Sequence, residues 1–338
     1  MASGNESYGT PLGPPQSRMV DDHVLAIIII CFFVIILGTI SFFGIVANVI
    51  NLIVFIRQGF KDTVNISLFS LAISDIGALI PLLWMSIGLN PYFFADPPFD
   101  PQEVLYLTSG WPHICFARIS GWITAFITLE RCLCIAMPLK VKTMITVKRT
   151  AIALVSIYVA MIGALLPVFY ALRLEPIFSP LKNETKFRTV YIPNGFAIES
   201  AVFLINAFSQ FVSFIVVIIC TIILVQALIS KSKWRKSTSS FGDHDSFSNR
   251  DKKVVKLVLF IAIIFIVCFL PSAINFLASS LEPEFNTYGK YGDLFVLMWS
   301  FSANLSATNS AVNIFVYYKM SSKYKQILDK MLLRSTKG

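Results

Sequence analysis

The sequence predicts an all-α membrane protein: a bundle of seven transmembrane helices with a short amphipathic eighth helix. Seven apolar stretches are each long enough to cross a hydrocarbon core of roughly 30 Å, which takes about 20 residues as a helix. The chain is 56% hydrophobic and 14% charged, whereas a soluble protein of this length needs charged side chains over much of its surface. We expect transmembrane helices at about residues 24–56, 64–90, 103–137, 147–172, 196–230, 251–281 and 290–318.

Charged residues are almost missing from the apolar stretches. Within residues 64–94 the only one is Asp75, within residues 104–129 it is Arg118, and residues 24–56, 150–172, 200–230, 257–281 and 294–318 contain none. Because an ionisable side chain inside a bilayer is costly, it is typical of positions that face the bundle interior and have a function. The few polar residues of the helices are therefore the candidates for functional sites.

The net charge of +9 follows the predicted topology. Twenty Lys and Arg residues fall in the segments after helices 1, 3, 5 and 7, and six fall on the opposite side. Such an excess marks the cytosolic side of a membrane protein. We expect a multi-pass protein of the plasma membrane with an extracellular N-terminus and a cytosolic C-terminus. The basic side would attract anionic membrane lipid, and no nucleic-acid partner is expected.

The two ends of the chain differ from the bundle. Residues 1–23 are polar and contain Pro and Gly, which is typical of a short disordered extracellular tail. Glycosylation sequons at Asn5 and Asn183 fall on the same side. Residues 319–338 carry apolar side chains at helical spacing from Tyr324, with Lys and Arg between them. This pattern predicts an amphipathic helix on the inner membrane surface and a cytosolic tail; a frayed tail is the alternative.

Polar motifs occur in a fixed order on the predicted helices. The motifs are Asn48 on helix 1, Leu71-Ala72-Ile73-Ser74-Asp75 on helix 2, Glu130-Arg131-Cys132 on helix 3, Cys268-Phe269-Leu270-Pro271 on helix 6, and Asn309-Ser310 with Asn313-Ile314-Phe315-Val316-Tyr317 on helix 7. Each is a weak signal alone, but their order on the right helices, from residue 24 to 334, resembles the rhodopsin-like (class A) G protein-coupled receptors.

The resemblance implies a receptor and not an enzyme. It would bind an extracellular ligand, a peptide or a small chemosensory molecule, and activate a heterotrimeric G protein by opening the cytosolic face between helices 3 and 6. The sequence departs from the family's pattern at several positions, for example at Ile314, where the family has Pro. In these departures it resembles a divergent invertebrate branch of the family, of molluscan chemosensory or peptide-receptor type. A transporter is the alternative class, but the paired repeats typical of transporters are missing from the sequence.

Asp75 lies in the middle of helix 2, where an acid must stay protonated or find donors and a cation. Ser120 lies eleven residues before Arg131, about 16 Å along helix 3 at 1.5 Å per residue, and reaches the same depth. The resemblance implies a sodium ion held by Asp75 and Ser120; the alternative is a protonated Asp75 in a water-filled network, and no other cofactor is expected. The further members of this polar network are Asn48, Asn309, Ser310 and Asn313.

Glu130 and Arg131 lie at the predicted cytosolic end of helix 3. The resemblance implies that Arg131 pairs with Asp251 of helix 6 and holds the inner face closed; a simple pair of Glu130 and Arg131 at the lipid interface is the alternative. An exposed ion pair contributes only about 0–1 kcal/mol, so this would be one restraint among several. Pro271 removes one backbone hydrogen bond and is expected to kink helix 6. The resemblance also implies that Leu139 and Tyr317 take part in G-protein coupling on the cytosolic side.

His113, Arg118 and Phe269 are the candidates for the ligand pocket. Arg118 lies thirteen residues before Arg131, about 20 Å toward the outer side, too deep for its guanidinium to reach lipid headgroups. A guanidinium matches a carboxylate with two hydrogen bonds, which makes an acidic ligand one interpretation. The alternative is a partner within the protein, such as helix carbonyls or Glu199.

The cysteine positions predict that no disulfide joins helix 3 to the second exterior loop. The family that the motifs resemble has such a disulfide, but none of the six cysteines falls in an exterior loop.

Overall fold

The computed structural model describes residues 21–92, 97–137, 141, 143–179, 183–237, 249–282, 284–285 and 289–335. Asn5 and Leu139 lie outside these ranges, and Asp251 is described for its backbone alone.

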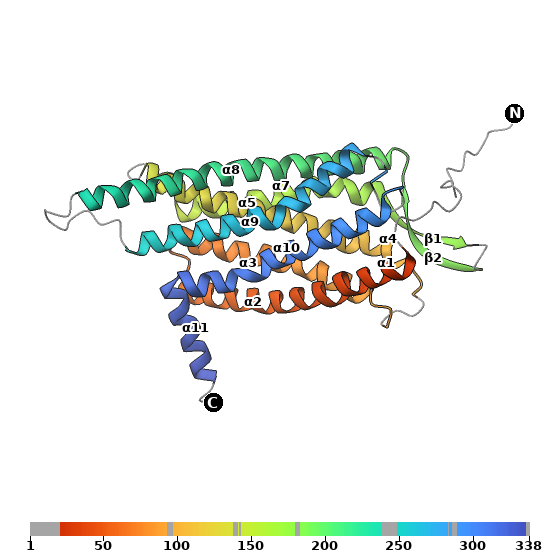
Figure 1. Cartoon of the computed structure of the whole chain (residues 1–338), viewed down its shortest axis with the longest axis horizontal. Helices are drawn as coiled ribbons and strands as arrows, with labels where there is room; N and C mark the ends of the chain where they lie inside the picture. Colours follow the sequence, from red (N-terminus) through yellow and green to blue (C-terminus); the bar gives the residue numbers. More distant parts are fainter. Residues whose placement is uncertain are drawn as a thin grey trace.

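Long helices run side by side along one axis (Figure 1). The first rod is continuous through α1 (Asp22–Ile28), the π-helical η1 (Ile29–Ile36) and α2 (Leu37–Gln58), and the third is continuous through α4 (Pro101–Leu105), the π-helical η2 (Tyr106–Gly110) and α5 (Trp111–Ala136). The others are α3 (Thr63–Gly88), α7 (Val147–Ala171), α8 (Gly195–Ser237), α9 (Asn249–Leu281) and α10 (Gly292–Met320).

The last helix, α11 (Ser322–Ser335), turns away from the bundle axis (Figure 1). Tyr324 and Leu328 are buried against the bundle, while Leu332 and Leu333 are exposed. The helix therefore uses one face to attach to the bundle. We call this end of the bundle the α11 end.

A β-hairpin occupies the opposite end of the bundle, which we call the hairpin end (Figure 1). Strands β1 (Leu172–Ser179) and β2 (Glu184–Tyr191) pair antiparallel, from Leu172 opposite Tyr191 to Ser179 opposite Glu184. Because this hairpin is part of the structure, the expected all-α class is incomplete. Its strands contain Val, Ile, Phe, Tyr and Thr, which favour extended backbone, but the sequence argument searched for apolar helices only.

Among the described residues, five helical segments have the length and hydropathy of membrane spans. They are His23–Gln58, Thr63–Gly88, Val147–Ala171, Gly195–Ala227 and Lys256–Leu281. Helices α5 and α10, with 26 and 29 residues, are long enough to cross a membrane but are not among these five. Helix α10 is rich in buried polar side chains, namely Ser300, Ser302, Asn304, Ser306, Asn309, Ser310 and Asn313.

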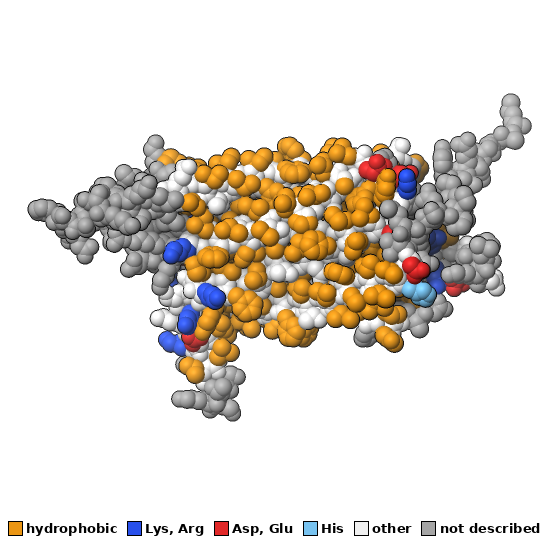
Figure 2. All heavy atoms as spheres, in the orientation of Figure 1, with side chains coloured by type: hydrophobic (Ala, Val, Ile, Leu, Met, Phe, Trp, Pro, Cys, Tyr) orange, Lys and Arg blue, Asp and Glu red, His pale blue; other side chains and the backbone are white. Residues whose placement is uncertain are grey.

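The outer surface of the bundle is apolar. Figure 2 shows hydrophobic side chains along its length and charged side chains toward its two ends. Large side chains such as Phe43, Val159 and Phe208 are 64%, 66% and 70% exposed. A continuous apolar surface of this extent is typical of a protein surrounded by lipid.

Helix α5 is the centre of the bundle. It packs against α3, α7, α8 and α9, and Ile119, Ile123 and Ile127 on its inner side are at most 1% exposed. The π-helical turn η2 precedes α5 and ends two residues before Pro112. Because proline cannot donate a backbone hydrogen bond and its ring displaces a carbonyl of the preceding turn, a wider turn fits there.

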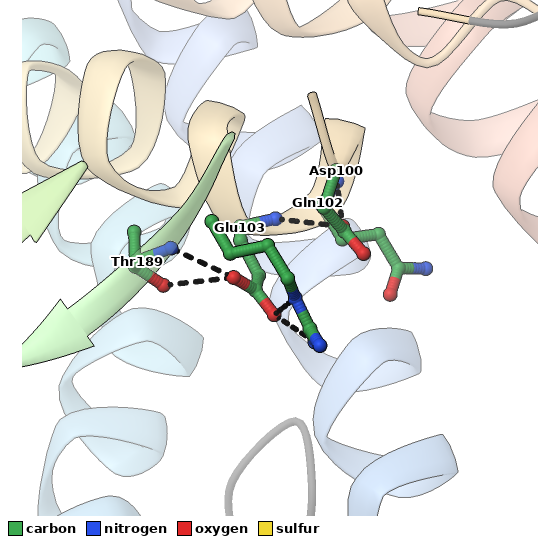
Figure 3. A network of polar contacts seen from close by, with 5 residues as sticks. Asp100, Gln102, Glu103 and Thr189 are labelled. Carbon is green, nitrogen blue, oxygen red and sulfur yellow. Dashed lines mark hydrogen bonds and ion pairs between the residues drawn. The ribbon is translucent and has the colours of Figure 1, made fainter. Parts of the chain in front are cut away.

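A set of polar contacts attaches the hairpin to the start of the α4–η2–α5 rod. Figure 3 shows the carboxylate of Glu103 turned toward β2. It accepts hydrogen bonds from the Thr189 backbone N–H (2.8 Å) and from Nε of Arg188 (3.0 Å), and the Arg188 Nη2 donates to the same carboxylate. The backbone beside it is joined as well, since the Asp100 N–H donates to the Phe187 carbonyl at 2.9 Å.

A second contact of this kind lies one turn further into the bundle. The hydroxyls of Tyr106 and Tyr191 donate to the two carboxylate oxygens of Glu199, at 2.7 and 2.6 Å. None of the six cysteines forms a disulfide. We call the contacts of Glu103 and Glu199 with the hairpin the polar clamp, since they join helix 3 to the second interhelical loop without a covalent bond.

We predict that Glu103→Gln lowers the melting temperature of the purified protein by several degrees. The substitution removes the charge from hydrogen bonds that contribute about 1–3 kcal/mol each. The measurement is thermal unfolding in detergent with and without reductant, and reductant should leave the wild-type transition in place.

The control is Glu184→Gln on the same hairpin. Its carboxylate pairs with Lys186 at 3.5 Å on the partly exposed surface, where an ion pair contributes little. A melting temperature of Glu103→Gln equal to that of the control would contradict a stabilising role for the clamp.

Candidate functional site

Asp75 is the centre of a hydrogen-bond network in the middle of the bundle. Its side chain is completely buried. Oδ1 accepts hydrogen bonds from the hydroxyls of Ser120 and Ser310, both at 3.0 Å, and Oδ2 accepts one from Nδ2 of Asn313 at 2.8 Å. The donors lie on α5 and α10, so the carboxyl group of α3 joins three helices.

The donor set around Asp75 fits a small hard cation. The Ser74 hydroxyl lies 2.8 Å from that of Ser120, so hydroxyl and carboxylate oxygens lie together, as hard cations prefer. A single carboxylate supplies one negative charge, and no group of three or more His, Cys, Asp and Glu residues lies together in the part of the chain that the structure describes. This chemistry matches a monovalent ion better than a divalent one.

Asn309 differs from its expected place in the network. It is buried one residue before Ser310, but the described contacts of Asp75 do not include it. Residue 313 is three positions after 310 and four after 309, so all three lie on one side of α10. Asn309 is therefore next to the network, without a described hydrogen bond to the carboxylate.

The network continues from Asp75 to α11, which sequence reasoning missed. Asn48 on α2 donates to the Ser310 carbonyl (2.7 Å), Asn51 donates to Asn48 (3.1 Å), and the Tyr324 hydroxyl donates to Asn51 (2.6 Å). A continuous chain of hydrogen bonds thus joins α11 to Asp75. The available signal was the second Asn at position 51, one helical turn after Asn48 in an apolar helix.

Glu130 and Arg131 lie together at the α11 end. Nη2 of Arg131 is 2.6 Å from Oε1 of Glu130, and the Thr63 hydroxyl donates to the same oxygen. Nε of Arg131 and Oε2 of Glu130 are buried without a hydrogen-bond partner among the described residues. Arg131 therefore retains a donor that a further acceptor could occupy.

Tyr317 and Pro271 lie in the interior of their helices. The Tyr317 ring is 1% exposed and packs against Phe55 and Tyr324, with ring centroids 5.3 and 5.6 Å away. Pro271 lies inside α9, where it cannot donate to the carbonyl of Val267. The structure thus shows how Tyr317 packs, and where Pro271 lies, in one state of the bundle.

Asn183 occupies the turn between β1 and β2. It is exposed, with a φ of 51°, a left-handed conformation that Asn adopts more readily than most residues. The side chain of this sequon is therefore accessible at the hairpin end.

His113, Arg118 and Phe269 line one cavity between α5, α9 and α10. The Arg118 guanidinium carbon lies 5.6 Å from the Phe269 ring centroid and 5.3 Å from that of Phe276. Nδ1 of His113 lies 3.1 Å from the Ala78 carbonyl. The cavity has a volume of about 30 Å³.

Sequence reasoning missed the remaining polar and aromatic lining of this cavity. A chain with 30 Phe residues and many Ser residues on apolar helices gives no signal that separates lining from core. The residues missed are Ser272, Phe276, Trp299, Ser302 and Ser306.

Comparison with known proteins finds receptors in each case reported below. The family model described as serpentine type 7TM GPCR chemoreceptor Srw matches residues 33–335. The chain is 22% identical over 303 residues to the galanin-like G-protein coupled receptor npr-9 of Caenorhabditis elegans, covering 84% of this chain and 69% of that one. It is 26% identical over 298 residues to the growth hormone secretagogue receptor type 1 of Sus scrofa (86% and 77%), and 26% identical over 306 residues to neuropeptide FF receptor 2 of Rattus norvegicus (87% and 70%).

We predict that Tyr324→Phe lowers the melting temperature by a few degrees. The ring keeps its packing, but the buried Asn51 Oδ1 loses its donor, at a cost of about 1–3 kcal/mol. The matched control is Tyr318→Phe, whose hydroxyl donates to Asp329 in an exposed position at 3.2 Å and should matter little. Equal melting temperatures of the two variants in thermal unfolding would show that the contact between α11 and α2 does not stabilise the bundle.

Proposed function

The chain belongs to the Srw family of serpentine seven-transmembrane G protein-coupled chemoreceptors, and we propose that it binds an extracellular peptide and activates a heterotrimeric G protein. It is thus a receptor and not an enzyme. The observation that carries the proposal is the cavity between α5, α9 and α10, which brings aromatic and polar side chains to the interior of a receptor bundle. In this reading α5 and α10 also cross the membrane, and their polar side chains face the interior.

A peptide is the ligand class that the relatives favour. One relative is named a neuropeptide FF receptor and another a galanin-like receptor. Ligand pockets commonly span roughly 300–1,000 Å³, whereas this cavity measures about 30 Å³, so its lining side chains would have to move apart to admit one end of a peptide. The alternative is a small chemosensory molecule, which the family description as chemoreceptors favours.

We place the hairpin end outside the cell and the α11 end in the cytosol of a plasma-membrane protein. The excess of Lys and Arg in the segments of the α11 end supports this orientation. It would expose Asn183, and Asn5 in the preceding tail, to glycosylation, and it would set the basic residues of α11 against anionic lipid. We propose α11 as the amphipathic helix at the inner membrane surface.

Activation would open the α11 end between α5 and α9. Nε of Arg131 is buried and has no hydrogen-bond partner among the described residues, and we propose that Asp251 in the first turn of α9 supplies its acceptor in the closed receptor. Because Pro271 interrupts the hydrogen bonds of α9, the part of α9 before it can move away from α5. Leu139 and Tyr317 would then contact the G protein or accompany the opening.

We propose that a sodium ion stabilises the closed receptor at Asp75. Its ligands would be the Asp75 carboxylate and the Ser120 hydroxyl, with Asn48, Ser310 and Asn313 supporting the site and Asn309 next to it. The ion would neutralise the buried carboxylate. The residues themselves hold α3, α5 and α10 together through hydrogen bonds.

The experiment that tests receptor function measures G protein activation by the full-length protein in membranes. We predict that Asp251→Ala raises guanine-nucleotide exchange in the absence of ligand by about two- to fivefold at equal surface expression, since one restraint of roughly 0.5–1 kcal/mol is lost. The control is Asp329→Ala on α11, away from Arg131. No exchange above background in wild type and both variants, across G protein classes, would overturn the proposed function. Unchanged exchange in Asp251→Ala alone would overturn only the restraint.

The sodium proposal predicts a difference between wild type and Asp75→Asn. Raising sodium at constant ionic strength, with choline as the replacement cation, should raise the melting temperature of the wild type by several degrees. Asp75→Asn keeps the size of the side chain but loses the charge, so sodium should leave its melting temperature unchanged. The same sodium response in both proteins would favour a hydrogen-bond network without an ion.

A further inference from the structure

The cavity between α5, α9 and α10 contains hydrogen-bond donors without acceptors. Nε and Nη1 of Arg118, Nε1 of Trp299 and Oγ of Ser306 are buried and have no hydrogen-bond partner among the described residues. All three residues line this cavity. They come from two helices, α5 and α10, so their convergence does not follow from the conformation of a single element.

The other polar side chains of the lining already have partners. Ser272 donates to the Phe269 carbonyl (2.8 Å), Ser302 accepts from Asn275 (2.8 Å), and His113 contacts the Ala78 carbonyl (3.1 Å). No Asp or Glu is among the lining residues. The unused hydrogen-bonding capacity of the cavity is therefore that of donors, and its only formal charge is the positive charge of Arg118.

Arg118 has no counter-charge in the described part of the protein. Its side chain is 4% exposed. Glu199, the carboxylate expected as an internal partner, accepts from Tyr106 and Tyr191 instead. The Phe269 and Phe276 rings flank the guanidinium, but an aromatic face compensates only part of the free energy of desolvating a cation. Water could accept hydrogen bonds here, yet it supplies no negative charge.

We infer that the cavity binds a carboxylate group of the ligand, held by Arg118 with the help of Ser306 and Trp299. A carboxylate has two oxygens that accept in one plane, which matches the fork of a guanidinium. The neighbouring Phe269, Phe276 and Trp299 rings supply an apolar wall for the group that carries it. The ligand is thus a peptide with a free C-terminal or side-chain carboxylate, or a small aromatic acid.

The inference rests on the proposed receptor function, since it names the ligand chemistry of the same cavity. The two can fail separately. Guanine-nucleotide exchange without ligand reports the receptor function, while binding of a small carboxylate to the purified protein reports the cavity and needs no G protein.

The probes are benzoate and its uncharged analogue benzamide, added at millimolar concentrations to the purified full-length protein at constant chloride. Benzoate should raise the melting temperature of the wild type in a concentration-dependent way, because a ligand that binds the folded state stabilises it. Benzamide, which has the same ring but no charge, should give less than a third of that shift. Equal shifts with both probes, or none with benzoate, would overturn the inference.

Three substitutions test whether benzoate binds in this cavity. Arg118→Gln should raise the benzoate concentration at half-maximal shift by about tenfold or more, since charge-assisted hydrogen bonds are lost. Ser306→Ala should raise it by about threefold while the cation remains. Arg173→Gln is the control: Arg173 lies on the hairpin over Tyr170, outside the cavity, and its removal should leave the benzoate response unchanged.

Should Arg118→Gln not fold, Ser306→Ala and Trp299→Phe carry the test, since each removes one donor and the first changes the shape of the lining little. A benzoate response equal to wild type in both would place the carboxylate elsewhere and overturn the inference. Peptide pairs that differ only in a free or amidated C-terminus then separate a C-terminal carboxylate from a side-chain one: a response to the free acid alone identifies the first.

Discussion

The arrangement of the bundle depends on one carboxylic acid that neither water nor lipid headgroups can reach. A buried polar group is costly unless it is hydrogen-bonded, so Asp75 requires donors from its neighbours, and these donors fix the rotation of α5 and α10 about their own axes. The same requirement brings α2 close. A Cβ atom at Gly44 would lie only 2.9 Å from a Leu79 methyl and 3.0 Å from Ala311 Cβ, and close approach through small residues is how membrane helices pack.

The two polar regions of the bundle differ in how far their hydrogen bonds are satisfied. The Ser120, Ser310 and Asn313 donors bind the Asp75 carboxylate, and the chain of bonds continues to Tyr324 on α11. Around Arg118 donors lack acceptors. The first arrangement stabilises one packing of the helices. The second lowers stability without a ligand, and such local cost is common at functional sites. Stability and recognition are thus assigned to different depths of the same helices.

The sequence allowed the apolar helices and the depth of the polar residues to be predicted, because hydropathy and the 1.5 Å rise are local properties. Ser120 and Asn313 lie beside Asp75 as depth alone suggested. Which side chains of one helix side contact the carboxylate is set by packing between helices, so depth could not separate Asn309 from Ser310. For the same reason the link from Asn51 to Tyr324 was missed. The hairpin was missed because the sequence argument searched for apolar helices only, although the two strands are adjacent in the sequence and contain residues that favour extended backbone.

The polar clamp at the hairpin end has a physical consequence that a disulfide would not have. A covalent bond is indifferent to dissolved ions, whereas the attraction between Glu103 and the half-exposed Arg188 weakens as ionic strength rises, with a screening length of roughly 8 Å at physiological salt. The clamp lies at the end that we propose faces outside. The attachment of the hairpin to α4 would then weaken as the salinity of the surrounding fluid rises, and the stability of this end would depend on its medium.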